Sequence, residues 1–333
     1  MARIFQTGGE MGHADYGDIS AGTVQTDQLR GSWSAYSFRG GTVSWDSAVS
    51  EFYFGYGYRG NLGLSMLQFE SPNGTANVTT IVNGTSNKIE VRRGNSGQTL
   101  LATGTTVFNT TTWYYIEGHF TINDSTGVVE IKINGVSETL TFVTGNSTNQ
   151  DTRNDAAAGG DTCSRMSFGG DSNIRFDDCY VNDTTGSQNT GYSGDIRISA
   201  YIPNAAGDTT GLTRGGSDSG SNFGQVDERP PNDATDYVFG TDTTSLDLYN
   251  IPNTSGVSDV QAVTLWLRAS KSDAGSGNIA HVLKSGGTQD VGSDLSLSTS
   301  WTYKRKNYNV DPTDSAAWTP SKIDGLQVGA KSR

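Results

Sequence analysis

Polar and apolar residues alternate along much of this chain, and turn residues separate the alternating runs. The clearest run is 128–133, which is followed by Asn134-Gly135 and by a second run over 136–142. Asn-Gly supplies the two positive-φ positions of a type I′ turn, so this stretch predicts a β-hairpin. Glu138 is the one residue that interrupts the apolar face of the returning strand.

Similar short runs recur at intervals of about ten residues, as in an antiparallel all-β sandwich or barrel. We expect strands over 4–8, 33–38, 51–58, 62–70, 77–82, 88–92, 112–122, 165–169, 174–181 and 195–201, and then over 237–239, 246–249, 260–269, 279–283, 295–297, 301–308 and 326–331. A single helical turn is expected near the end, entered at Pro320 and ended by Gly325. No run is long and apolar enough to span a membrane.

A change in composition divides these runs into two groups. Residues 204–222 are dense in Gly, Asp, Ser and Thr, and we place a domain boundary near residue 206. The expected domains are therefore 1–205 and 206–333, the second being a smaller β-sandwich with apolar residues of its own.

Composition and charge narrow the class of protein. Apolar residues make up 33% and aromatic residues 10% of the 333, with 43 glycines, which suits short strands and many turns rather than disorder. The net charge of −12, from 35 acidic and 23 basic side chains, disfavours nucleic acid as a partner. The first residues carry no apolar signal core, so we expect the protein to be made in the cytoplasm.

Four places carry motifs that go beyond alternation. They are the opening 3–10, the 113–117 strand with its Asn-Gly hairpin, the segment 176–186, and the pair of segments 227–231 and 318–329. Together they resemble virion structural proteins of tailed bacteriophages that carry a laminin-G-like, concanavalin A-like jelly roll. The resemblance implies such a jelly roll in the first domain, followed by the second β-sandwich.

The resemblance also implies a role and a location. We expect a non-enzymatic structural protein, exposed on the capsid or tail of a virion, that acts through contacts with other virion proteins and with copies of itself. A decoration role on the capsid fits this expectation. The alternative is a receptor-binding, lectin-like module that recognises a glycan on the host surface, and a third hypothesis is a glycan hydrolase.

Hydrolysis of a glycan needs two carboxyl groups that flank the bond. On one strand, two residues share a face only at even spacing. Asp177 and Asp178 are adjacent, so we expect them to point to opposite faces, and Glu117 has His119 but no carboxylate two residues away. The three histidines are scattered, and no Gly-x-Ser-x-Gly elbow is present. These observations predict that the protein is not an enzyme.

Three aromatic residues fall on the polar faces of predicted strands. They are Tyr53, Trp113 and Trp266. Each is a candidate either for stacking on a sugar ring or for an interface with a neighbouring subunit, and the sequence leaves both interpretations open.

Laminin-G-like modules often bind calcium, so the resemblance makes Asp171, Asp177 and Asp183 weak candidates for Ca²⁺ ligands; the alternative is a set of solvated acidic loops. No other cofactor is expected. If 163–168 and 174–179 form a hairpin, Cys163 and Cys179 lie opposite each other and a disulfide is possible. The alternative is two free, buried thiols.

Overall fold

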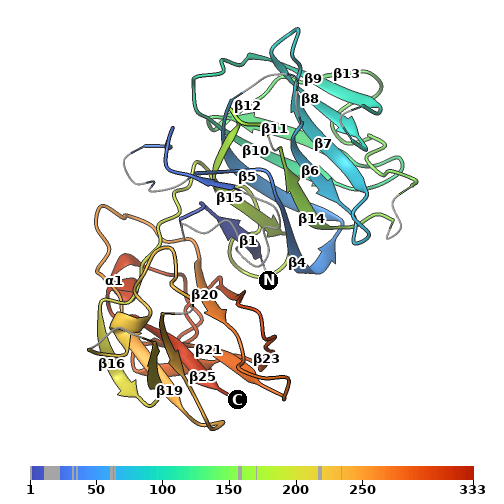
Figure 1. Ribbon diagram of the computed structural model, residues 1–333. Helices are drawn as coiled ribbons and strands as arrows, with labels where there is room; N and C mark the ends of the chain where they lie inside the picture. The colour runs from blue at the N-terminus through green and yellow to red at the C-terminus, as the bar shows by residue number, and fades with distance from the viewer. Residues whose placement is uncertain are drawn as a thin grey trace. The chain divides into compact units, whose positions relative to one another are not determined.

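The computed structural model describes residues 2–10, 23–31, 34, 37–60, 63, 65–95, 97–156, 160–169, 171–216, 220–233 and 235–333. The chain divides into two compact units, one reaching Ser199 and the other running from Ala200 to Arg333. Both units are built almost wholly of antiparallel strands (Figure 1). No helix among the described residues is long and apolar enough to cross a membrane.

Two sheets pack face to face in the first unit and form the antiparallel jelly-roll sandwich that the sequence predicts. Sheet A has the order β12 (Val136–Ser137), β11 (Val128–Ile133), β10 (Tyr114–Thr121), β5 (Glu51–Arg59), β15 (Arg175–Asp183), β3 (Ser37–Arg39) and β2 (Thr23–Gln25), and β1 (Arg3–Thr7) also pairs with β15. Sheet B has the order β13 (Thr141–Phe142), β9 (Leu100–Val107), β8 (Lys88–Arg93), β7 (Ala76–Val82), β6 (Ser65–Glu70), β14 (Cys163–Phe168) and β4 (Thr42–Val49).

Aromatic side chains fill the space between the two sheets. Phe52 and Phe54 of β5 point inward, and the ring centroid of Phe52 lies 4.8 Å from that of Phe69 in sheet B. On the neighbouring β10, Gly118 is paired with Phe54, and a Cβ there would lie 2.3 Å from its ring. The Phe54 ring thus occupies the space that a side chain at position 118 would need. Because Phe52 and Phe54 point inward, the alternate residues of β5 lie on the outer face of sheet A.

The predicted hairpin is confirmed, but its returning strand is shorter than expected. Asn134 and Gly135 have φ of 51° and 79°, and β12 ends after two residues. The Glu138 carboxylate then accepts hydrogen bonds from the backbone N–H and the hydroxyl of both Thr105 and Thr106 in β9. The chain therefore crosses from sheet A to sheet B at the residue that interrupts the alternation.

The hairpin between 163–168 and 174–179, on which the possible Cys163–Cys179 disulfide depends, does not form. β14 pairs with β4 and β6 in sheet B, whereas β15 pairs with β5 in sheet A, so the turn between them carries the chain across the sandwich. Cys163 and Cys179 consequently do not face each other on paired strands; both thiols are free and buried. Burial raises the pKa of the Cys163 thiol to about 12.

The second unit is a smaller sandwich. Its main sheet has the order β16 (Ala205–Thr210), β19 (Leu246–Asn250), β25 (Gln327–Ser332), β21 (Asn278–Ser285) and β22 (Thr288–Val291), with β23 (Leu295–Ser296) also on β21. Two pairs complete it, namely β17 (Thr213–Gly216) with β18 (Asp236–Phe239) and β20 (Val263–Ala269) with β24 (Thr302–Tyr308). The helices are the 3-10 turn η1 (Phe223–Gln225) and α1 (Pro320–Asp324).

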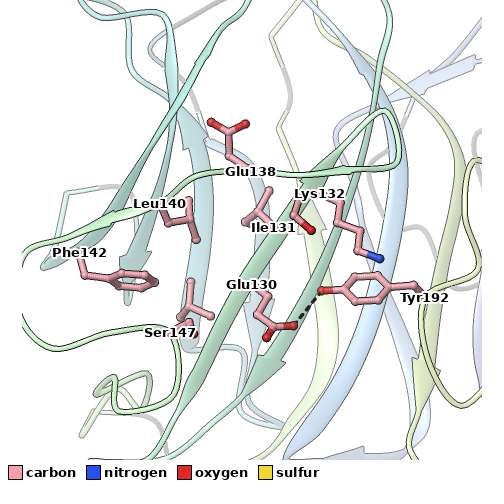
Figure 2. A pocket seen from close by; sticks show the side chains of 10 residues that line it. Glu130, Ile131, Lys132, Glu138, Leu140, Phe142, Ser147 and Tyr192 are labelled. Carbon is pink, nitrogen blue, oxygen red and sulfur yellow. Dashed lines mark hydrogen bonds between the residues drawn. The ribbon is translucent and has the colours of Figure 1, made fainter.

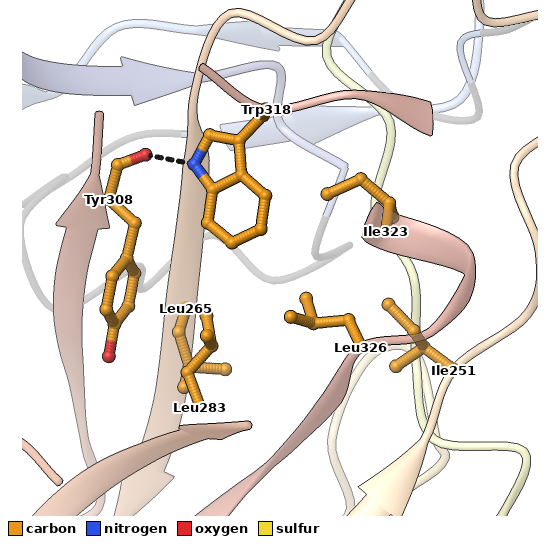
Figure 3. Close-up of a cluster of buried hydrophobic side chains, with 7 residues drawn as sticks. All are labelled: Ile251, Leu265, Leu283, Tyr308, Trp318, Ile323 and Leu326. Atoms are coloured by element: carbon orange, nitrogen blue, oxygen red, sulfur yellow. Dashed lines mark hydrogen bonds between the residues drawn. The ribbon is translucent and has the colours of Figure 1, made fainter. Parts of the chain in front are cut away.

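A cluster of seven buried side chains forms the core of this unit (Figure 3). They are Ile251, Leu265, Leu283, Tyr308, Trp318, Ile323 and Leu326. The indole N–H of Trp318 donates to the Tyr308 carbonyl at 2.9 Å, which satisfies its one polar group. The helical turn α1 forms as predicted, with Pro320 at its first position and Gly325 at its end.

Candidate functional site

The three aromatic candidates lie in three different places. Tyr53 pairs with His119 near the end of β10, whereas Trp113 comes directly before the start of β10. Trp266 belongs to β20 of the second unit, where its ring is edge-on to Tyr303 with centroids 6.0 Å apart. Tyr53 and Trp113 therefore lie apart along the first unit, and Tyr53 belongs to a larger cluster.

That cluster lies on the outer face of sheet A. The Tyr53 ring is parallel to the imidazole of His119, with centroids 4.2 Å apart and 6° between the planes. Tyr192, from the segment that follows β15, packs edge-on against Tyr53 at 4.9 Å. We call these three side chains the aromatic cluster.

Two carboxylates flank the aromatic cluster. Glu51 lies 2.9 Å from Nε2 of His119, and Glu130 lies 3.4 Å from Nδ1. Glu130 also accepts a hydrogen bond from the Tyr192 hydroxyl at 3.2 Å. The Glu51 and Glu130 side chains are 43% and 46% exposed, so they also face solvent.

The sequence analysis missed Glu51, Glu130 and Tyr192. Glu51 and Glu130 lie on β5 and β11, on either side of β10, and this neighbourhood is set by long-range pairing. Spacing along one strand tests only for a second carboxylate beside Glu117, whereas both carboxylates that contact His119 lie on adjacent strands. Tyr192 stands in a Gly- and Ser-containing stretch without alternation, so the pattern carries no signal for it.

A hollow of about 320 Å³ opens beside the aromatic cluster, along the outer edge of β11. Figure 2 shows Leu140 and Phe142 on one side of it and Lys132 and Tyr192 on the other. It is lined by Val129, Glu130, Ile131, Lys132, Ser137, Glu138, Leu140, Phe142, Ser147 and Tyr192. We call it the β11 hollow. One of its sides is formed by residues 138–142, where the chain crosses from sheet A to sheet B.

The segment 191–198, which we call the strap, holds Tyr192 in place. Its backbone N–H groups donate to the side chains of the sheet: Ser193 to the Tyr180 hydroxyl at 3.0 Å and Gly194 to the Glu117 carboxylate at 2.8 Å. Inside the predicted strand over 195–201, the backbone N–H of Ile198 likewise donates to a side chain, that of Asp178, and no strand forms there.

Buried polar side chains of sheet A also bind the strap. The Asn182 amide donates to the Gly191 carbonyl at 2.8 Å, and the Arg3 guanidinium donates to the Ser193 hydroxyl at 2.7 Å. Arg3, Asn182 and Glu117 are at most 1% exposed. Burial lowers the pKa of Arg3 to about 10, and its guanidinium also lies over the Tyr180 ring.

At the far end of the strap, Asp177 and Asp178 are both buried on the outer face of sheet A. Their expected placement on opposite faces is wrong, because β15 has a bulge here and Asp178 has a φ of 50°. Asp178 is paired with Arg30 at 2.5 Å and accepts from the backbone N–H of Ile198 at 2.7 Å. Burial, aided by the charge of Asp178, raises the pKa of Asp177 to about 9.

The weak calcium candidates do not share one site. Asp177 is buried beside Asp178, Asp183 ends β15 and accepts from Thr185, and Asp171 accepts from the Asn173 N–H in the preceding turn. Within the described ranges, no group of three or more His, Cys, Asp or Glu side chains is arranged to hold a metal ion.

Comparison with known proteins adds only distant structural likenesses. No protein-family model matches the chain, and no curated protein matches it significantly. The carbohydrate-binding module CBM66 from Bacillus subtilis is 9% identical with a TM-score of 0.30, and covers 50% of this chain and 97% of its own. The galectin LEC-6 of Caenorhabditis elegans is 10% identical with a TM-score of 0.29, over 43% and 89%.

A third likeness extends over both units. The binding domain of botulinum neurotoxin DC, solved in complex with SialylT, is 8% identical with a TM-score of 0.35, over 99% of this chain and 98% of that one. All three TM-scores are below 0.5, so we base no functional argument on them; the jelly-roll assignment rests on the strand order of the two sheets.

Proposed function

We propose that the protein is a non-enzymatic glycan-binding module and that the β11 hollow is its binding site. The observation that supports this is the chemistry of the lining, in which aromatic rings, carboxylates, hydroxyls and one ammonium group face a solvent-open space. A sugar presents both C–H faces that pack against aromatic rings and hydroxyls that bond to carboxylates. A volume of about 320 Å³ also falls at the lower end of the range of small-molecule sites.

Binding is favoured over hydrolysis by how the carboxylates are used. A glycan hydrolase needs two carboxyl groups that flank the glycosidic bond. Glu51 and Glu130 come from different strands and flank the His119 ring instead. Glu51 bonds to His119, and Glu130 bonds to both His119 and Tyr192. We therefore assign these carboxylates to holding the aromatic cluster in place.

A glycan array with the full chain tests this proposal. We expect the wild type to bind a defined set of glycans, and Tyr192→Ala to bind them at least 10-fold more weakly, because the ring and its bond to Glu130 are lost. Phe239→Ala, which removes an exposed ring in the second unit, is the matched control and should bind normally. Failure of the wild type to bind any glycan would contradict the proposal, and release of new reducing ends would show a hydrolase.

We also propose that the module is displayed on the capsid or tail of a bacteriophage virion, next to other virion proteins and copies of itself. The support is the resemblance of the segments 3–10, 113–117, 176–186, 227–231 and 318–329 to such proteins. Glycan binding would then serve attachment to the host, and Trp113 and Trp266 would be candidates for contacts between subunits.

Labelling purified particles with a specific antibody and viewing them by electron microscopy tests the location. Label confined to the tail supports attachment to the host, whereas label spread over the shell supports a decoration role and argues against receptor binding. Particles without label would contradict the virion proposal.

A further inference from the structure

We infer that the β11 hollow takes one terminal neutral hexose that carries an N-acetyl group, and that it rejects sugars that carry a carboxylate. This inference rests on the proposed function and adds the class of ligand. Three features of the hollow lead to it: the sign of its charges, the division of its lining into polar and apolar sides, and its size.

The charges of the hollow disfavour an anionic sugar. Glu130 lines it with a carboxylate that is 46% exposed, whereas the carboxylate of Glu138, also in the lining, is bound by Thr105 and Thr106. Lys132 is the only cation in the lining, and its ammonium group already lies 3.8 Å from the centre of the Tyr192 ring. The exposed Glu130 carboxylate beside one engaged cation, on a chain with a net charge of −12, would repel the carboxylate of a uronic or sialic acid.

The two sides of the hollow differ in polarity. Leu140 and Phe142, both half-buried, form an apolar side opposite Lys132 and Tyr192 (Figure 2). A sugar hydroxyl placed against that apolar side would lose its hydrogen bonds to water without gaining a partner. The methyl of an acetamido group would instead bury apolar surface there.

The remaining atoms of an acetamido group also find partners in the lining. Its N–H can donate to the Glu130 carboxylate, and its carbonyl can accept from the Ser147 hydroxyl; both residues line the hollow. The C–H face of the sugar ring can pack toward Tyr192. Because the hollow has a volume of only about 320 Å³, it fits one terminal residue better than the middle of a long chain.

The test compares binding of six methyl glycosides to the full chain by isothermal titration calorimetry: those of N-acetylglucosamine, N-acetylgalactosamine, glucose, galactose, glucuronic acid and N-acetylneuraminic acid. We expect at least one N-acetylated neutral sugar to bind 5-fold or more tightly than its parent hexose, and no binding of the two acids. Leu140→Asn should abolish the preference for the N-acetylated sugar. Val143→Asn, an exposed position outside the hollow's lining, is the control and should keep it.

The possible failures are distinguishable. Equal binding of an N-acetylated sugar and its parent, or tighter binding of either acid, would overturn the inferred ligand class and leave the proposed function standing. No binding of any of the six here, together with none on the glycan array, would overturn both. If Leu140→Asn lowers the thermal unfolding temperature, Phe142→Leu provides a milder change to the same apolar side, and the wild-type comparison remains decisive.

Discussion

At the scale of single residues, Asp177 and Asp178 show how the surroundings separate two adjacent carboxyl groups. Asp178 faces the Arg30 guanidinium, so its charge has a buried counter-ion. Asp177 accepts from the Ser34 hydroxyl, but its burial, followed by the charges of Asp178 and Glu10, opposes its ionisation and raises its pKa. Burial raises the pKa of both carboxyl groups, but the charge of Arg30 opposes this at Asp178, so the pKa of Asp177 is the one raised to about 9.

This assignment predicts how stability depends on pH. An unfolded aspartate ionises near pH 3.9, whereas buried Asp177 ionises only near 9, so its contribution to stability is present below pH 4 and falls as pH rises through this window. The loss is at most about 1.4 kcal/mol per pH unit. Asp177→Asn keeps an oxygen acceptor without the charge, so we expect it to match the wild type near pH 4 and to be increasingly more stable toward pH 9.

Urea unfolding of both proteins at several pH values checks this prediction. Asp46→Asn, at an exposed position in β4, is the matched control. Parallel curves for the wild type and Asp177→Asn across the whole pH range would show that Asp177 is ionised in the folded state.

At the scale of elements, alternation identified the strands that carry large side chains. Residues 51–58, 112–122 and 128–133 were expected as strands and correspond to β5, β10 and β11. In contrast, β4 and β9 were missed, because their many Thr, Ser and Ala residues give only a weak contrast between faces.

Which strands become neighbours was much harder to predict. Both 165–169 and 174–181 are strands, but they belong to different sheets, because their partners lie about 100 to 130 residues away in the sequence. The candidate site was hard to predict for the same reason. Tyr53 could be assigned to the outer face, but which residues surround it is decided by strand pairing and by the course of the strap. These residues are His119, Glu130 and Tyr192.

The crossing at Glu138 gives a prediction at this scale. Its carboxylate satisfies the backbone N–H groups of Thr105 and Thr106, so Glu138→Ala should leave both without their partner. We expect a loss of about 1–2 kcal/mol, because the site is partly exposed. Faster amide exchange at these two threonines, measured by NMR, would locate the effect, and Ser137→Ala serves as the neighbouring control. Unchanged exchange at both would argue that the crossing is held by other contacts.

At the scale of the whole molecule, each unit has a core of its own. The first is built on aromatic residues of β5, β10 and β6, and the second on the cluster around Trp318. We therefore propose that residues 200–333 fold without the rest of the chain. The expected result is one cooperative unfolding transition and a dispersed NMR spectrum.

A change in the second core provides the comparison. Trp318→Ala in the same fragment should cost about 3–5 kcal/mol, because it leaves a cavity and removes the indole donor to the Tyr308 carbonyl. If the unsubstituted fragment gives an NMR spectrum with poorly dispersed peaks, the second unit needs the first in order to fold.

The burial of the two cysteines has a practical consequence for chemical labelling. Cys163 and Cys179 are at most 1% exposed, and burial raises the pKa of both thiols, so neither is a ready nucleophile for maleimide reagents. A cysteine introduced at Val136, which is 71% exposed on the hairpin next to the β11 hollow, would then be the one reactive thiol. A fluorophore attached there could report ligand binding in a chain that keeps both of its native cysteines.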